Sequence, residues 1–101
     1  MEKEQFARRL VALRQAKNIS ARDMSLSLGQ SAGYINNIEN GVNLPSMGMF
    51  FYICDYLCIT PEEFFRTETA DPVRLRELCE KMQRLNSHQL ELLEQLVLEM
   101  R

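Results

Sequence analysis

The sequence has few of the residues that build metal, redox or disulfide-stabilised sites. Its 101 residues include three cysteines and one histidine. The cysteines, Cys54, Cys58 and Cys79, are odd in number and lie among apolar residues, which argues against a disulfide framework and favours a reducing compartment. Cys54 and Cys58 would share a helix face, but no second pair completes a zinc ligand set. We therefore expect no metal and no cofactor.

Long apolar runs are also missing. The longest, Met47 to Cys54, stops at Asp55 and is too short to cross a bilayer. The opening residues are charged and polar, unlike a signal peptide. No nucleophile–base set or phosphate-binding loop is present. We expect a cytoplasmic protein that does not associate with membranes and is not an enzyme.

Positive charge is absent from the middle of the chain. Residues 23–65 contain no Lys or Arg and five acidic residues, whereas residues 3–22 contain six basic residues and one acidic residue. The whole chain has 12 basic and 14 acidic residues, which excludes a polycation that coats nucleic acid by charge alone. Its 46% apolar content is too high for a disordered acidic tail and supports one small core.

Apolar residues recur at helical spacing, and no stretch alternates as a half-buried strand would. Helix starts are marked by Ser20, Ser31, Ser46 and the capping box Thr60–Glu63, and helix ends by Gly29 and by Asn40-Gly41. The third helix is predicted to run from Ser31 to Asn40. The residues expected to face inward are Phe6, Leu10, Leu13, Met24, Leu28, Ile35, Ile38, Phe50, Phe51, Ile53, Cys54, Leu57, Phe64 and Phe65. We predict an all-α fold with five helices in residues 1–66.

Residues 67–101 are predicted to form a separate helical hairpin. Residues 67–72 are polar and are predicted to form a linker. Asp71-Pro72 opens one helix, and Asn86-Ser87 separates it from another. The apolar stripes of these helices comprise Leu75, Leu78, Cys79, Met82 and Leu85, and then Leu90, Leu93, Leu96, Val97 and Met100. A hairpin cannot bury both stripes alone. We expect it to pack back on residues 1–66 or, in preference, to pair with a second copy.

The segment from Ser20 to Pro45 has the spacing of a helix-turn-helix. Two short helices meet at Gly29, and the small residue Ser25 lies where the two must approach closely. Met24, Leu28, Ile35 and Ile38 would fill the wedge between them. The second helix has no long apolar residue on its outward side.

In detail this stretch resembles the Xre family, which includes the phage Cro and C1 repressors. The similarity covers roughly residues 6–66 and is most specific in Tyr34-Ile35-Asn36-Asn37-Ile38-Glu39-Asn40-Gly41 with the downstream Leu44-Pro45. Further matching segments are Leu13-Arg14, Ile19-Ser20, Leu28-Gly29-Gln30-Ser31 and Ile59-Thr60-Pro61-Glu62-Glu63-Phe64-Phe65. The resemblance implies a five-helix, lambda-repressor-like DNA-binding domain whose third helix enters the major groove.

The resemblance also implies roles for individual residues. Those expected to meet base edges are Ala32, Gly33, Asn36 and Asn37; Asn37 is the preferred reader because a carboxamide pairs with adenine N6 and N7. Those expected to contact phosphates are Lys17, Arg22, Ser31, Tyr34, Asn40 and Asn43. Arg14 and Glu39 are expected to pair and to hold the third helix at its docking angle.

The sequence departs from the family in two respects. Ala21 stands where the family usually has Gln, and the third helix and following loop lack the usual Lys or Arg. Phosphate neutralisation would then fall to Arg8, Arg9, Lys17 and Arg22. The resemblance implies a sequence-specific transcriptional regulator, expected to be a repressor that binds a palindromic operator as a homodimer through residues 67–101. The alternative is a protein-interaction module, such as an antitoxin or an antirepressor partner, with weak or no DNA binding.

Overall fold

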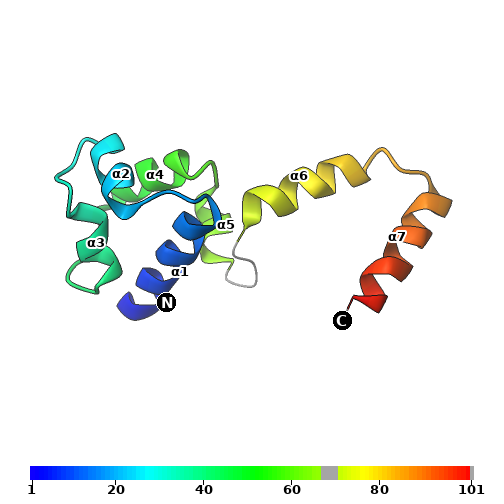
Figure 1. The fold of residues 1–101 in the computed structure, drawn as a ribbon, viewed down its shortest axis with the longest axis horizontal. Coiled ribbons are helices and arrows are strands. Elements are labelled where there is room, and N and C mark those ends of the chain that lie inside the picture. The colour runs from blue at the N-terminus through cyan, green and yellow to red at the C-terminus, as the bar shows by residue number, and fades with distance from the viewer. Residues whose placement is uncertain (67–70, 101) are drawn as a thin grey trace.

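The protein is all-α in the computed structural model, which describes residues 1–66 and 71–100 (Figure 1). The helices in this part of the chain are α1 Lys3–Ala16, α2 Ala21–Ser27, α3 Tyr34–Glu39, α4 Met47–Tyr56, α5 Pro61–Phe65, α6 Pro72–Met82 and α7 Ser87–Glu99. Residues 67–70 of the predicted linker lie outside the described residues. Within the described residues, none of the helices is long and apolar enough to cross a membrane.

The first five helices enclose one apolar core, as predicted. Its buried members are Phe6, Leu10, Leu13, Met24, Ile35, Ile38, Phe50, Ile53, Cys54, Leu57, Ile59 and Phe64. The predicted burial of Phe51 and Phe65 is wrong, because these side chains are 50% and 49% exposed. Each follows a buried Phe directly and points about 100° away from it around the helix, which here turns it toward the solvent side.

The predicted helix boundaries are confirmed at most ends. Ser46 and Thr60 cap α4 and α5 by accepting hydrogen bonds from the backbone N–H groups of Met49 and Glu63. Gly29 and Gly41 have φ values of +74° and +76°, which is the left-handed conformation that ends a helix at little cost for glycine. These local signals fix where the helices of the five-helix unit begin and end.

Residues 71–100, here called the C-terminal arm, extend away from this unit. Asp71 caps α6 through the backbone N–H of Arg74, and Asn86 caps α7 through that of Gln89. In Figure 1, α6 runs outward from the five-helix unit, and α7 then turns and diverges from α6. The apolar residues left exposed along the arm are Leu75, Leu78, Leu90, Leu92, Leu96, Val97, Leu98 and Met100.

Arg9 has a structural role rather than the expected role in phosphate neutralisation. It is 5% exposed, and its guanidinium donates to the backbone carbonyls of Glu63, Phe64 and Arg66 at 2.7, 2.6 and 2.6 Å. These are the carbonyls at the end of α5, where a cation also opposes the negative end of the helix dipole. The contact anchors α5 to α1. This matters for α5 because a helix of five residues has few hydrogen bonds of its own.

We predict that Arg9→Ala lowers the free energy of unfolding by about 2–3 kcal/mol, because buried carbonyls at the end of α5 lose their donor. Urea denaturation followed by circular dichroism measures the change. Arg8→Ala is the matched control, since Arg8 is the exposed neighbour on the same helix, and its effect should stay within about 0.5 kcal/mol. Equal effects of the two substitutions would contradict the anchoring role.

Candidate functional site

The exposed side of α3 carries a row of carboxamides. Ile35 and Ile38 are buried on the inner side, so Asn36, Asn37 and Asn40 are exposed on the outer side. Among the described residues, no side chain or backbone group hydrogen-bonds the side-chain amides of Asn36 and Asn37. Both amides therefore offer a donor and an acceptor to an external partner.

The predicted start of this helix is wrong by three residues. Ser31 does not cap α3; Ser31, Ala32 and Gly33 form a turn in which the Ser31 carbonyl accepts from the Tyr34 backbone N–H at 3.1 Å. Gly33 is the N-cap and contributes no side-chain bond. Ser31 and Gly33 are exposed, whereas Ala32 is half-buried.

The hydroxyl of Ser25 takes over the capping role from α2. Ser25 is fully buried, and its Oγ accepts from the Ile35 backbone N–H at 2.9 Å while donating to the Ala21 carbonyl at 2.7 Å. The orphan N–H of Ile35 in the first turn of α3 is thus satisfied across the helix pair. The sequence indicated only that Ser25 is small. Its capping role could not be found there, because Ser25 and Ile35 belong to different helices.

Arg14 and Glu39 connect α1 to the end of α3. The guanidinium donates to both carboxylate oxygens, with Nε–Oε2 at 2.7 Å and Nη2–Oε1 at 2.9 Å. Arg14 also donates to the Ile19 carbonyl at 2.8 Å, just before α2 begins. The hydrogen bond with Glu39 raises the pKa of Arg14 above its ordinary value, so the guanidinium stays charged. One side chain therefore holds the angle of α3 against both neighbouring segments.

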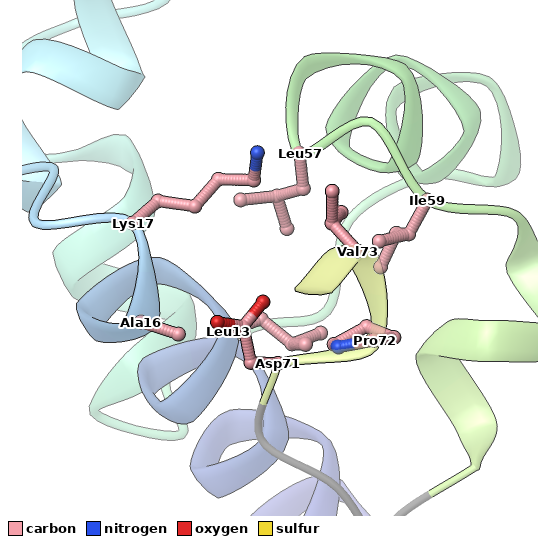
Figure 2. A pocket seen from close by; sticks show the side chains of 8 residues that line it. All are labelled: Leu13, Ala16, Lys17, Leu57, Ile59, Asp71, Pro72 and Val73. Carbon is pink, nitrogen blue, oxygen red and sulfur yellow. The ribbon is translucent and has the colours of Figure 1, made fainter. Parts of the chain in front are cut away.

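The remaining residues expected to contact phosphate lie in different surroundings. Arg22 is exposed in the first turn of α2, and Asn43 is exposed in the loop after α3. Tyr34 is half-buried at the start of α3, and burial raises the pKa of its phenol, which stays protonated and able to donate. Lys17 instead lines the joint between α1, α4 and the start of α6, where none of its neighbours belongs to α3 (Figure 2).

The acidic residue of α3 is paired. Glu39 binds Arg14 of α1 at 2.7 Å. The outer side of α3 therefore presents neutral amides rather than negative charge. The adjacent loop adds two apolar residues, Val42 and Leu44, which are 66% and 51% exposed and to which the sequence assigned no binding role.

The chemistry of this surface is hydrogen bonding. No group of three or more His, Cys, Asp or Glu side chains placed to hold a metal ion occurs within residues 1–66 and 71–100. Cys54 lies in the core, where burial raises the pKa of its thiol to about 11. A thiol with this pKa stays protonated near neutral pH and acts as a small apolar core residue.

One comparison with known proteins gives a match. A family model described as helix-turn-helix matches residues 3–64, which is more than half of the chain. No match was found among curated proteins or among solved structures. The matched range covers α1 to α4 and ends within α5.

We predict that Ser25→Ala lowers the free energy of unfolding by about 1–2 kcal/mol, since the Ile35 N–H loses its acceptor in a buried position. Hydrogen exchange at the Ile35 amide should also accelerate by more than global destabilisation explains. Ser27→Ala is the matched control, because Ser27 is exposed on the same helix. Unchanged protection of the Ile35 amide in Ser25→Ala would contradict the capping role.

Proposed function

Because the chain belongs to the Xre-type helix-turn-helix family of DNA-binding regulators, we propose that it is a sequence-specific transcriptional regulator. We propose more specifically that it is a repressor that binds a palindromic operator in the cytoplasm as a homodimer. The observation that carries this proposal is the exposed, unpartnered amide row formed by Asn36 and Asn37 on α3 and Asn40 at its C-cap. In a helix-turn-helix the second helix of the motif lies in the major groove.

Base readout by this surface favours A·T pairs. The carboxamides of Asn36 and Asn37 match the N6 donor and N7 acceptor of adenine. Ala32 and the exposed Val42 offer methyl groups that suit the thymine methyl. Guanine is most often read by Arg or Lys, and residues 23–65 contain neither. We propose that Gly33 lets the turn approach the bases closely and adds no side-chain contact.

Phosphate binding by this chain depends mainly on neutral groups. Ser31, Tyr34, Asn40 and Asn43 supply hydroxyl and amide donors, and Arg22 supplies the charge. Lys17 contacts a phosphate only if the duplex extends as far as the pocket that Lys17 lines beside Leu57. Few cations contribute, so counterion release is small and the affinity of one protomer for DNA is modest.

A dimer compensates for this modest affinity. The arm leaves the apolar stripe of α7 without cover from its own chain, since none of the residues of α7 is buried. We propose that a second copy covers this stripe. Pairing sets two α3 helices about one DNA turn apart, about 34 Å, and raises the effective concentration of the second half-site.

An alternative function follows from the same shortage of cations. The exposed residues Phe51, Tyr52 and Phe65 and the uncharged α3 surface also suit a protein-interaction module, such as an antitoxin or an antirepressor partner. In that case the chain binds DNA weakly or not at all.

Titration against random genomic DNA at several salt concentrations separates the two functions. A DNA-binding regulator loses affinity as salt rises, and the slope of log affinity against log salt counts the phosphates that it neutralises. We expect a clear but shallow slope of about two to four phosphates for each dimer. Absence of binding at low salt would favour the protein-interaction module.

We predict that Asn37→Ala lowers affinity for a duplex selected from a random pool by about 1–3 kcal/mol and leaves affinity for random DNA nearly unchanged, because Asn37 contacts a base rather than a phosphate. Fluorescence anisotropy with both duplexes measures the two affinities. Gln83→Ala, an exposed amide on the arm, is the control. Equal losses on both duplexes would show that Asn37 reads no base.

We predict that Leu93→Glu converts the dimer to a monomer, because it places a charge in the apolar stripe of α7. Sedimentation equilibrium measures the mass. Gln95→Glu adds the same charge on the opposite side of the helix and should leave the dimer intact. A wild-type chain that sediments as a monomer at micromolar concentration would refute dimerisation through the arm.

A further inference from the structure

The arm meets the five-helix unit at two separate points. At the first, Pro72 is buried and Val73 packs on the core, beside Leu13, Leu57 and Ile59 (Figure 2). This apolar contact holds the first turn of α6 in place. By itself it works as a pivot, because it does not fix the direction in which the rest of the helix points.

The second point is Arg76, one turn further along α6. Its Nη1 donates to Oε1 of Glu63 at 2.6 Å, and its Nη2 donates to the carbonyl of Cys58 at 2.8 Å. Both acceptors are fixed in position. Glu63 Oε1 also accepts the backbone N–H of Thr60 at 2.9 Å in the capping box of α5, and Cys58 is held in the left-handed region with φ +60°.

The two points together define the axis of α6. Past Arg76, no described residue of the arm hydrogen-bonds residues 1–66, and the apolar side chains of α6 stay exposed or half-buried. Within the described residues, Arg76 therefore makes the outermost hydrogen bonds that restrain the direction of the arm. Its guanidinium bridges the start of α5 and the end of α4, so it fixes the arm relative to the unit that carries α3.

We propose that Arg76 is a positioning residue that sets the spacing between the two DNA half-sites that the dimer accepts. The proposal rests on the proposed function, since it requires a dimer joined through the arm. If α6 swings about the contact at Pro72 and Val73, the distance between the α3 helices of the two protomers changes. The 11 residues of α6 span about 16 Å, so a swing of about 20° moves its far end by about 6 Å. One base pair of B-DNA rises about 3.4 Å, so this freedom corresponds to about one or two base pairs.

The test compares Arg76→Gln with Arg74→Gln on a set of duplexes. Arg74 is an exposed arginine on the same helix and has no part in the contact with Glu63, so Arg74→Gln is the matched control. The duplexes carry the selected palindrome with zero to four base pairs inserted at, or removed from, its centre. We expect the wild type and Arg74→Gln to lose about tenfold or more in affinity when the spacing changes by two base pairs.

We expect Arg76→Gln to keep its affinity for a single half-site and to lose less than about threefold over the same change of spacing, because its arm is free to swing. Arg76→Lys retains an ion pair with Glu63 but cannot also reach the Cys58 carbonyl, so its profile should be intermediate. A spacing profile for Arg76→Gln that matches the wild type would overturn the proposal.

A second measurement tests the clamp without DNA. Spin labels at Gln15→Cys and Gln83→Cys, with Cys58 and Cys79 changed to Ser and the labelled chain diluted in unlabelled chain, report the distance between α1 and the end of α6. The distance distribution should broaden in Arg76→Gln and not in Arg74→Gln; an unchanged width also overturns the proposal. If a second half-site does not increase the affinity of the wild-type chain for DNA, the proposed dimeric repressor is refuted. The width of the distance distribution then still shows whether Arg76 directs the arm.

Discussion

The arrangement of α1, α2 and α3 depends on the Arg14 guanidinium. It binds both oxygens of Glu39 at the end of α3 and the Ile19 carbonyl ahead of α2, so that three segments share one rigid group. The two side chains are 14% and 6% exposed. At this depth the removal of one partner leaves an uncompensated charge, which costs far more than an exposed pair would. Replacing both partners is therefore easier than replacing either alone, and the pair constrains the orientation of α3 relative to α1 more than it adds net stability.

Three arginines of this protein hold its helices together by binding groups of other segments. Arg9 caps the end of α5, Arg14 holds α3 and Arg76 holds α6, and each of the three donates to at least one backbone carbonyl from another segment. A planar group with five donors suits such bridging, which lysine cannot reproduce. Of the cations expected to neutralise phosphates, Arg9 is turned inward, whereas Arg8 and Arg22 stay exposed. The exposed side of α3 is mostly neutral and offers hydrogen-bonding groups rather than positive charge.

Local signals in the sequence predicted the fold well, because caps, glycine stops and helical periodicity act over one or two turns. The prediction was wrong where the outcome depends on groups distant in sequence. The start of α3 moved from Ser31 to Tyr34, with its Ile35 N–H satisfied by Ser25 of another helix. Arg9 looked like a surface cation because the carbonyls that it binds are more than 50 residues away. For the candidate site, the sequence correctly located exposed amides at Asn36 and Asn37, while the roles assigned to them stay predictions.

The neutral exposed side of α3 and the exposed apolar stripe of α7 have a common explanation under the proposed function. If one half-site were bound tightly through many phosphates, a monomer would occupy random DNA and the operator almost equally, since phosphate contacts carry no sequence information. Weak phosphate binding lowers that background. Under the proposed function, affinity for the operator then comes from two half-sites engaged at once, and this requires the pairing of α7. Occupancy of such an operator depends on the dimer, so it rises more steeply with protein concentration than a monomer's would. In the proposed dimeric repressor, the exposed leucines of the arm and the missing cations of residues 23–65 together make DNA binding conditional on dimerisation.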